Sequence, residues 1–480
     1  MNSVKVKLPL FVKKILKKFI DGGFEIYIVG GVVRDILSEK KPIDWDFTTS
    51  ARPEEILKLF PDAFYDNKFG TVGVTNPEEE NKKDYFGRQS VYEITTFRTE
   101  SGYSDRRRPD SVSWGKTVEE DLKRRDFTIN ALALRLVPRQ SSGLAQGKLL
   151  KVKSEKEEEL EIIDLFGGQE DLGVKLIRAV GNPDERFSED ALRMIRAIRL
   201  ATQLGFKIED RTLAAIKKNA GLIKHVSWER IRDELLKLLS YEHAADGFTF
   251  LLSSGLLELV MPEVIRGYGV KQARHHIYDV WTHSLMSLKH CPAGDPIVKL
   301  AAFLHDVGKP IVAQGEGEAR TFYNHEVVGA RIARRIAERL RFSKKQKEKL
   351  VTLVRWHQFS VDEHQTEKAA RRFIRRVGKE NLKEMVDLRI GDRLGGGCKT
   401  ETSWRLRKFL KMVEDVQKHT PSVKDLKVDG HEVMKVLGIK PGPKVGEVLE
   451  ALFEEIMEDR SKNTREYLLG RIREIGGKGS

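Results

Sequence analysis

The sequence predicts an α+β protein in which a small mixed sheet near the N-terminus is followed by a mostly helical chain. From Asn182 onward, apolar residues recur mainly at helical spacing. With 480 residues, 40% of them hydrophobic, the chain can bury the cores of roughly three or four compact units. Strand-like runs rich in β-branched residues gather near the N-terminus: Tyr27–Val29, Ile43–Thr49, Phe69–Thr75 and Val91–Phe97.

The composition favours a polyanionic partner and a reducing compartment. A formal net charge of +14 suits nucleic acid, although charge alone does not separate RNA from DNA or from a membrane surface. The two cysteines, Cys291 and Cys398, are too few for a disulfide framework. The first 20 residues, MNSVKVKLPLFVKKILKKFI, are typical of an amphipathic helix packed on the N-terminal sheet domain and not of a signal peptide. No apolar stretch of the sequence is long enough to span a bilayer. We expect a cytoplasmic protein with no membrane partner; the sequence leaves its oligomeric state open.

The stretch Tyr27–Thr49 carries the strongest chemical signal. Gly30 and Gly31 end the first strand before a predicted helix, where backbone N–H groups and the helix start favour a phosphate. Asp44 and Asp46 stand two residues apart on the second predicted strand, so both carboxylates point to one face. Two like charges this close repel unless a cation lies between them, and oxygen-only ligation suits magnesium. Either feature alone is commonly a plain turn or a solvated edge, but the two together predict nucleotidyl transfer.

This stretch, with Arg34 between the glycines and the carboxylates, resembles the head of the bacterial-type (class II) tRNA CCA-adding enzymes and their poly(A) polymerase relatives, members of the DNA polymerase β nucleotidyltransferase superfamily. The resemblance implies a polymerase-β-like head in which Asp44 and Asp46 hold Mg²⁺. It also implies that Gly30, Gly31 and Arg34 bind the nucleotide.

The head is predicted to continue with a helix and two strands. Arg52–Phe60 reads as a helix capped by Thr49-Ser50. The two later strands complete the sheet. On the last of them, Glu93 is either a third metal carboxylate or an ordinary exposed strand residue.

Phe97–Lys116 has no sustained period and reads as a solvated basic loop. It also resembles the flexible loop that helps the active site of CCA-adding enzymes change from CTP to ATP. The residues that match this loop are Arg98, Asp105, Arg107 and Pro109.

Val118–Leu134 reads as a helix that aims Arg124 and Arg125 at triphosphate oxygens. The segment RRDFTINA matches a signature of the same family; the alternative interpretation of RRD, which this match disfavours, is a surface ion pair. Ser141–Glu159 is a polar insertion expected to extend a hairpin, and Ile163–Val180 closes the head.

Asn182–Leu200 is predicted to be a helix capped by Ser188, with a polar stripe along one ridge. Without context the stripe would be a salt-bridge ladder on a solvated helix, but EDALRMIRAIR matches the family's nucleobase-reading motif. An accepting carboxylate beside a donating guanidinium complements cytosine and adenine, whereas guanine and uracil present the opposite order. We assign this reading to Asp190 and Arg193. The stripe that faces the nucleotide consists of Asp190, Arg193, Arg196 and Arg199.

His225–Ser240 reads as an amphipathic helix. Its residues Glu229, Arg230 and Glu234 resemble the next neck motif of the family, which supports the base reader without direct chemistry.

A second constellation lies in the helical half of the chain. A lone histidine is more often a packed core residue than a ligand. Here the order of histidines and aspartates resembles the HD phosphohydrolase superfamily, which implies a centre with a divalent metal of unidentified type, and phosphate near Lys309. His325 and His357, which are additional to the His…His-Asp…Asp ligand set of that superfamily, suit a binuclear site. The expected ligands are His283, His305, Asp306, His325, His357 and Asp392.

Together the resemblances imply a domain order and a function. Residues 1–180 would be the nucleotidyltransferase head, 181–265 the helical neck with the base reader and an RNA-binding region, 266–400 the HD domain and 401–480 a helical tRNA-binding tail. The expected function is template-independent addition of CCA to tRNA from CTP and ATP, with HD hydrolysis as an additional activity. The alternatives are a poly(A) polymerase, an enzyme that adds only the terminal A, or an HD-type RNA-end phosphohydrolase whose head only binds RNA.

Overall fold

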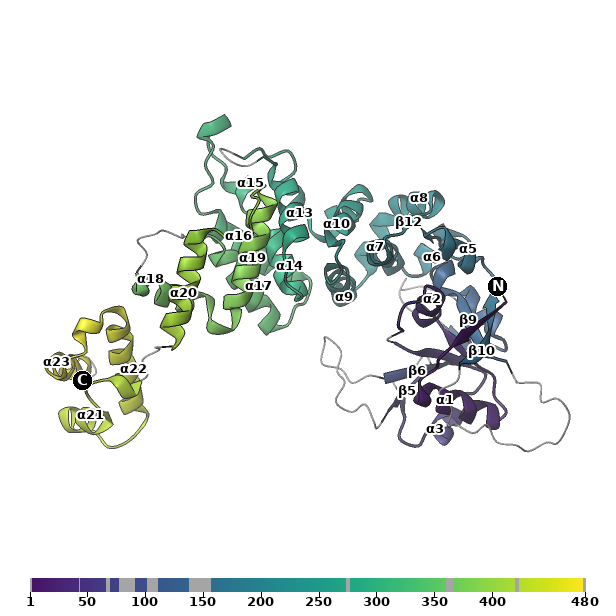
Figure 1. Cartoon of the computed structure of the whole chain (residues 1–480), viewed down its shortest axis with the longest axis horizontal. Helices are drawn as coiled ribbons and strands as arrows, with labels where there is room; N and C mark the ends of the chain where they lie inside the picture. The colour runs from purple at the N-terminus through teal and green to yellow at the C-terminus, as the bar shows by residue number, and fades with distance from the viewer. Residues whose placement is uncertain are drawn as a thin grey trace. The chain divides into compact units, whose positions relative to one another are not determined.

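The computed structural model describes residues 2–42, 44–65, 70–76, 91–101, 111–137, 157–272, 277–359, 366–418 and 423–477. These residues form two compact units. Unit 1 comprises Met1–Ile265 with Arg339–Phe342, and unit 2 comprises Arg266–Glu338 with Ser343–Ser480 (Figure 1).

Within the described part of unit 1, eight strands form a mixed sheet in the order β1-β10-β9-β2-β3-β6-β5-β4. The central pair β3 and β6 is parallel, and the other neighbours are antiparallel. This confirms the predicted mixed sheet. The strands are β1 (Ser3–Val6), β2 (Ile26–Val29), β3 (Asp46–Thr49), β4 (Phe64–Tyr65), β5 (Thr71–Thr75), β6 (Val91–Thr96), β9 (Leu132–Leu136) and β10 (Glu158–Asp164).

The sheet is buried on both faces at β2, because the residues of this strand alternate between two cores. Ile26 and Ile28 join the larger core with α1 (Leu10–Asp21) and α3 (Pro53–Leu59) (Figure 1). Tyr27 and Val29 join a second core with α4 (Val118–Lys123). The N-cap of α3 is Arg52, whose N–H donates to the Glu55 carboxylate at 2.8 Å, and not the predicted Thr49-Ser50.

The predicted helix Val118–Leu134 is wrong beyond its first turns. The helix α4 ends at Lys123, and the 3₁₀ turn η2 (Thr128–Asn130) leads into β9. The Asp126 carboxylate accepts the N–H of Phe127 at 2.9 Å, which favours a turn over a helix. The run that follows is apolar because it is a central strand buried on both faces, a pattern that resembles a buried helix in sequence.

The predicted loop Phe97–Lys116 contains two strands among its described residues. Its ends form the antiparallel ribbon of β7 (Arg98–Ser101) and β8 (Ser111–Trp114). Apolar and polar residues alternate only weakly in these short strands, which explains why they were not predicted from the sequence. Asp105, Arg107 and Pro109 lie outside the described residues, as does most of the insertion Ser141–Glu159. The strands that flank that insertion, β9 and β10, do form the expected hairpin.

The predicted helix Asn182–Leu200 is two helices, because the chain is extended at Asp190 (φ −142°, ψ 100°). Ser188 lies inside the first helix, where its hydroxyl donates to the Asp184 carbonyl, and it caps nothing. The main elements of this region are α5 (Gly168–Gly173), β11 (Leu176–Ile177), α6 (Pro183–Glu189), α7 (Leu192–Leu204), β12 (Lys207–Ile208), α8 (Asp210–Asn219), η3 (Ala220–His225), α9 (Trp228–Leu239), α10 (Ala244–Ser253), α11 (Leu256–Val260) and α12 (Pro262–Ile265).

Unit 2 is helical where it is described. Glycines let α19 (Leu382–Gly395) pack closely on α13 (Val280–His290). A Cβ on Gly391 would lie 2.6 Å from the Ser287 carbonyl oxygen, and one on Gly395 would lie 2.5 Å from the Ser287 nitrogen. A separate core unites the last three helices. The main helices are α13 (Val280–His290), α14 (Pro296–Leu304), α15 (Lys309–Val312), α16 (His325–Arg339), α17 (Lys344–Trp356), α18 (Glu367–Val377), α19 (Leu382–Gly395), α20 (Trp404–Lys418), α21 (Gly430–Leu437), α22 (Pro443–Glu458) and α23 (Arg465–Gly477).

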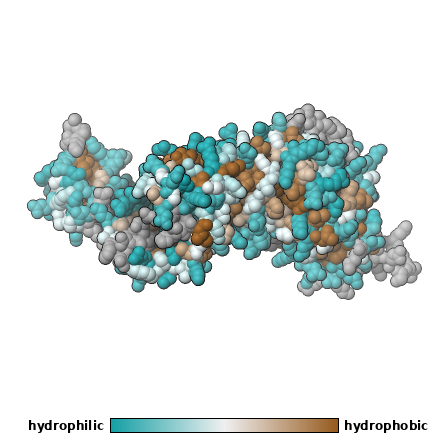
Figure 2. All heavy atoms as spheres, turned by 90° about the horizontal axis from the view of Figure 1, so that it is seen from above, coloured by the Kyte–Doolittle hydropathy of each residue, from teal (hydrophilic) through white to brown (hydrophobic). Residues whose placement is uncertain are grey.

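Hydrophilic atoms cover most of the face in Figure 2, with hydrophobic atoms in scattered groups. Among the described residues, no helix has the length and apolarity needed to cross a membrane.

Candidate functional site

The carboxylates of the head lie where β3 begins. Asp46 is the first residue of β3 and stands in register with Glu93 of β6, so both side chains leave the same face of the sheet. Asp44 is exposed and precedes β3, which corrects the expectation of a strand from Ile43; Ile43 itself lies outside the described residues. Burial, then Glu93 and Asp44, raise the pKa of Asp46 to about 7, while Arg125 acts in the opposite direction. Carboxylates that disfavour one another's charge in this way form an environment that suits a cation.

The glycine turn brings the triphosphate-binding candidates together. Gly30 has φ +80°, and a Cβ there would lie 3.3 Å from both Arg125 Nη1 and Asp46 Oδ2. A side chain at this position would therefore fill the space between the basic and acidic groups. Arg34 is buried: Nη1 donates to Asn130 Oδ1 at 3.0 Å, and Nε and Nη2 donate to Asp35 Oδ1.

One cavity of about 1000 Å³ collects most of these groups. Glu93 also lines it, as do Lys237 and Asp126, to which the sequence assigned no role. Of the described candidates, Gly30, Gly31, Arg34, Asp190 and Arg199 do not line it. The predicted site residues that do are Asp44, Asp46, Arg124, Arg125, Arg193 and Arg196.

Arg124 and Arg125 follow α4 in a turn and are held by one carboxylate that sequence reasoning missed. Asp121 is fully buried; its Oδ1 accepts from Arg124 Nε at 3.0 Å and its Oδ2 from Arg125 Nη2 at 3.1 Å. Burial opposes the charge of Asp121, but the two arginines lower its pKa below the ordinary value. The i, i+3 and i, i+4 spacing from Asp121 was the available signal.

The base-reading candidates are paired differently from the expectation. Asp190 accepts two hydrogen bonds from Arg230, at 3.1 and 2.7 Å. Arg193 instead donates to Glu189 at 2.7 Å and to the Arg124 carbonyl at 3.0 Å. The expectation that Arg193 is the partner of Asp190 is therefore wrong, because Asp190 lies before α7 and not on its ridge.

The next two arginines of α7 join carboxylates that are distant in the sequence. Arg196 Nη1 donates to Asp126 Oδ2 at 3.0 Å, and Arg199 Nε donates to Glu234 Oε2 at 2.6 Å. Glu234 is buried and also lies 3.7 Å from Arg196. The neck residues Arg230 and Glu234 thus orient α7, as the motif resemblance implied.

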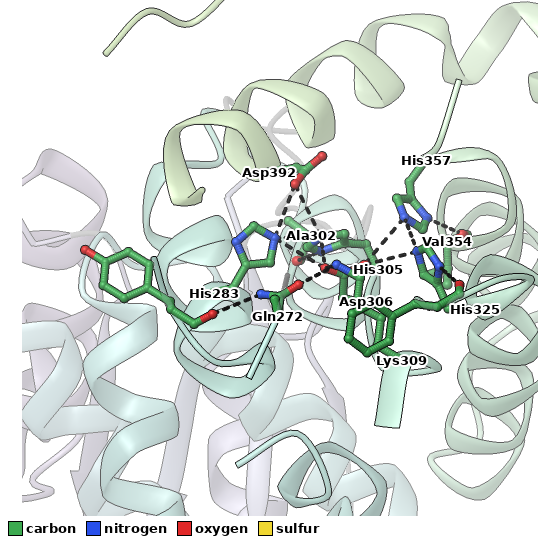
Figure 3. A network of polar contacts seen from close by, with 12 residues as sticks. Gln272, His283, Ala302, His305, Asp306, Lys309, His325, Val354, His357 and Asp392 are labelled. Carbon is green, nitrogen blue, oxygen red and sulfur yellow. Dashed lines mark hydrogen bonds and ion pairs between the residues drawn. The ribbon is translucent and has the colours of Figure 1, made fainter. Parts of the chain in front are cut away.

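The six histidines and aspartates predicted as HD ligands converge in unit 2, around Asp306 (Figure 3). Asp306 Oδ2 lies 3.3 Å from His283 Nε2 and 3.1 Å from His305 Nε2. Its Oδ1 lies 3.3 Å from His325 Nε2 and 3.7 Å from His357 Nε2. Asp392 Oδ1 completes the first group, 3.2 Å from His283 Nε2. Two ligand sets therefore share one carboxylate.

The tautomers of this cluster suit metal ions. Nδ1 of His325 lies 2.8 Å from the Phe322 carbonyl oxygen, and Nδ1 of His357 lies 2.8 Å from that of Val354. A carbonyl only accepts, so Nδ1 carries the proton in each ring. The two Nε2 lone pairs then face each other at 3.3 Å, an arrangement that repels unless a cation lies between them.

The charge of the cluster depends on His305, His357 and Lys309. Burial would lower the pKa of His305, but Asp306 and Asp392 raise it to about 10, whereas burial and His305 lower that of His357 to about 3. The buried Lys309 donates to Asp306 Oδ2 at 2.6 Å and to Gln272 Oε1 at 2.6 Å, so it lies beside the cluster; phosphate binding by Lys309 stays a prediction.

A mixed sheet that places carboxylates and a basic wall around one cavity, with a glycine turn beside it, is the arrangement expected of a nucleotidyltransferase domain. Residues 26–178 match the poly A polymerase head domain. Residues 205–266 match the RNA- and SrmB-binding site of polymerase A, and residues 323–472 match tRNA nucleotidyltransferase domain 2. Three segments of the chain thus match models of poly(A) polymerase and tRNA nucleotidyltransferase domains.

Several relatives of this chain are CCA-adding enzymes. It is 46% identical to the CCA-adding enzyme of Lactobacillus helveticus over 256 residues, 52% of this chain and 56% of that enzyme. It is 42% identical to the CCA-adding enzyme of Geobacillus kaustophilus over 243 residues, 50% of this chain and 52% of that enzyme. The chain thus spans about half the length of the curated relatives it matches. The fold is similar to that of the Bacillus stearothermophilus CCA-adding enzyme in complex with CTP, with a TM-score of 0.64, 25% identity and 98% of each chain covered.

Proposed function

We propose that this protein adds C, C and A to the 3′ end of tRNA, using CTP and ATP without a nucleic-acid template. The observation that carries the proposal is the single cavity in which the carboxylates Asp44 and Asp46 meet the arginines of the turn after α4 and of α7. The similarity of the fold to a CCA-adding enzyme in complex with CTP supports the same function.

The acidic end of the cavity would bind Mg²⁺ through Asp44 and Asp46. The raised pKa of Asp46 fits this role, because burial and then the neighbouring carboxylates penalise its charge until a cation compensates them. Bound Mg²⁺ would supply Lewis-acid activation of the tRNA 3′ hydroxyl and charge stabilisation at the leaving pyrophosphate. Glu93 is a candidate for a further ligand because it stands beside Asp46 on the neighbouring strand, on the same face of the sheet.

The basic wall would position the nucleotide. Arg124 and Arg125, held by Asp121, can donate charge-assisted hydrogen bonds to triphosphate oxygens. The open glycine turn at Gly30 and Gly31 leaves room for the same phosphates. Arg34 would act through the turn rather than by contact, because its guanidinium is engaged by Asp35 and Asn130.

Base selection is assigned to Asp190 and Arg193, with Arg196 and Arg199 in support. Cytosine and adenine each present an amine donor beside a ring-nitrogen acceptor, which a carboxylate and a guanidinium complement. Arg230 would position Asp190 for this role, since it donates a hydrogen bond to each of the two carboxylate oxygens. Buried groups left unpaired by guanine or uracil would give discrimination of about 10⁴-fold, as in other hydrogen-bonding sites.

This function is tested by nucleotide addition to tRNA in reactions from which CTP or ATP is left out. Purified protein is incubated with tRNA lacking CCA, with CTP alone, with ATP alone and with both. We expect two additions with CTP alone and a complete CCA end with both. A long A tail would favour a poly(A) polymerase, and A addition restricted to tRNA that already ends in CC would favour the A-only enzyme. No addition under any condition would favour a head that only binds RNA.

The cluster around Asp306 supports a second candidate function, metal-dependent phosphohydrolysis. Two ligand sets share its carboxylate, and the facing Nε2 atoms of His325 and His357 require a cation. The bound pair of divalent ions, whose identity the residues leave open, would supply an activated hydroxide. Release of inorganic phosphate from 3′-phosphate RNA ends, or ring opening of 2′,3′-cyclic phosphate ends to a monoester, in the presence of Mn²⁺, Co²⁺, Ni²⁺ or Mg²⁺, tests it; an Asp306→Ala variant that retains hydrolysis would contradict it.

The cytoplasm is the proposed location. The cysteines fit a reducing compartment, because Cys291 is buried and unpaired and Cys398 is exposed and unpaired.

A further inference from the structure

We propose that unit 2 carries a second nucleotide-binding site, an apolar cavity between α18 and α22 that receives one nucleotide of an RNA strand. The choice of RNA rests on the function proposed above, because tRNA is the polynucleotide that the head would extend. The cavity measures about 530 Å³, within the range of about 300–1,000 Å³ that small-molecule sites occupy.

The walls of the cavity suit a base. Ile374 of α18 and Val416 of α20 contribute aliphatic surface, and Phe453 of α22 contributes an aromatic ring. Every base has a flat π-face, so an aromatic and aliphatic slot binds bases with little regard to sequence.

The rim of the cavity suits a phosphate. The opposite face of α18 is buried through Ala370, Phe373 and Val377, which leaves the basic face of the helix on the cavity. Like charges three and four residues apart repel on a helix, and an anion relieves that repulsion. The basic rim consists of Lys368, Arg371, Arg372, Arg375 and Lys379.

Arg371 gives the sharpest indication that the rim binds an anion. Its side chain is 9% exposed, and Nη2 donates to Glu367 Oε2 at 2.8 Å. Its Nη1 is buried and has no hydrogen-bond partner among the described residues. A buried guanidinium N–H left without an acceptor is unfavourable, so this group favours an oxygen that is not part of the chain.

The far wall distinguishes a nucleotide from a plain anion. Glu450 and Glu454 lie one turn apart on α22 and line the same cavity. Carboxylates accept hydrogen bonds from exocyclic amines and repel further phosphates. The cavity therefore combines a phosphate end, a stacking surface and an amine-accepting edge, which together fit one nucleotide rather than a polyphosphate.

Local hydrogen–deuterium exchange tests the site directly. Exchange is followed in α18 and α22 of the full chain, with a tRNA transcript or with AMP as the probe. We expect tRNA to slow exchange in both helices. Protection by AMP as well would identify a site for free nucleotides, with the same chemistry; protection by neither probe would overturn the proposal.

Variants separate the cavity from a merely basic surface. Arg371→Gln should weaken tRNA binding about tenfold, the effect of one charge-assisted hydrogen bond. Ile374→Trp narrows the slot without a change in charge and should weaken binding to a similar degree. Arg334→Gln, at an exposed arginine of α16, is the matched control and should leave binding within about twofold. Unchanged binding in Ile374→Trp, with its fold confirmed by circular dichroism, would overturn the cavity as the site.

The same measurement in Asp46→Ala keeps the two proposals distinct. This variant should lose nucleotide addition and keep protection of α18 and α22. Addition without protection would reject the second site alone, and protection without addition by the wild-type protein would reject the proposed function alone.

Discussion

Arg230 holds Asp190 through two parallel hydrogen bonds, from Nη1 to Oδ1 at 3.1 Å and from Nη2 to Oδ2 at 2.7 Å. The two residues are 40 positions apart and join α9 to the start of α7. A bidentate pair fixes the plane of the carboxylate as well as its position. The base-reading carboxylate is thus oriented by a residue outside the helix on which it was expected to lie.

Asp190→Ala should therefore impair CTP and ATP use together. The loss of a charge-assisted hydrogen bond is worth about 1.5–3 kcal/mol, or about ten- to a hundredfold in kcat/KM. Steady-state kinetics with all four nucleotides, on tRNA that ends before and after the two cytosines, measure it. Discrimination against UTP and GTP should weaken as well. A collapse of CTP use with normal ATP use would contradict a shared base reader.

Arg230→Ala should reproduce part of that loss without any contact to the base. The carboxylate remains but is no longer held in one plane, so kcat should fall more than KM rises. Arg230→Lys keeps the charge and loses the bidentate geometry, and it should rescue less than half of the effect in free energy. Wild-type kinetics in both variants would show that the pair does not position Asp190.

Glu234→Gln should destabilise unit 1 by about 3 kcal/mol, because it removes one partner from a buried ion pair with Arg199. Burial raises the pKa of Glu234 but the arginines lower it below its ordinary value of 4.5. Its stabilising effect is thus present above pH 4.5 and is lost as the pH falls through the lower folded value. Urea unfolding across this range measures it, with the exposed Glu229→Gln as control. Equal stability of the two variants at pH 7 would contradict the ion pair.

Metal content should separate the two ligand sets around Asp306. We expect His283→Ala to lose one divalent ion, His357→Ala to lose the other, and Asp306→Ala to lose both. Inductively coupled plasma mass spectrometry of protein loaded with Mn²⁺ or Ni²⁺ measures this, with His290→Ala on the same helix as control. The paired variant His305→Ala with Asp306→Ala should keep nucleotide addition nearly intact. If that variant is folded and lacks addition, the two sites are not independent.

Gly395→Val should separate the metal ligands without touching them. Its Cβ would meet the Ser287 nitrogen at 2.5 Å, so α19 must move away from α13 and carry Asp392 away from His283. We expect overpacking to cost about 1–3 kcal/mol and metal affinity to fall. Gly446→Ala is the control, because a Cβ there meets nothing within 4 Å. Unchanged metal binding in Gly395→Val would show that the cluster tolerates the shift.

The sequence predicted four strands of the mixed sheet, the glycine turn and the set of HD residues that converge, because these depend on local spacing or on a complete motif. The prediction failed where a short apolar run fits either a buried helix or a strand buried on both faces. This is the case for β9, which is a strand because it pairs with β2 and β10. The prediction also failed at Asp190, where a helix ends and another begins. The partners of Asp190 and Arg196 are 40 and 70 residues away in sequence, and only the fold brings them together.

Single-turnover incorporation of labelled CTP into tRNA lacking CCA tests the central claim most directly, with Asp46→Ala compared to Asp62→Ala, an exposed carboxylate of the same head. Loss of a group that stabilises charge in the transition state costs at least about 10²–10³-fold. We predict a loss of this size or larger in Asp46→Ala, with tRNA binding retained by gel shift, and normal incorporation in Asp62→Ala. Wild-type incorporation by Asp46→Ala would contradict the assignment of this cavity as the site of nucleotidyl transfer.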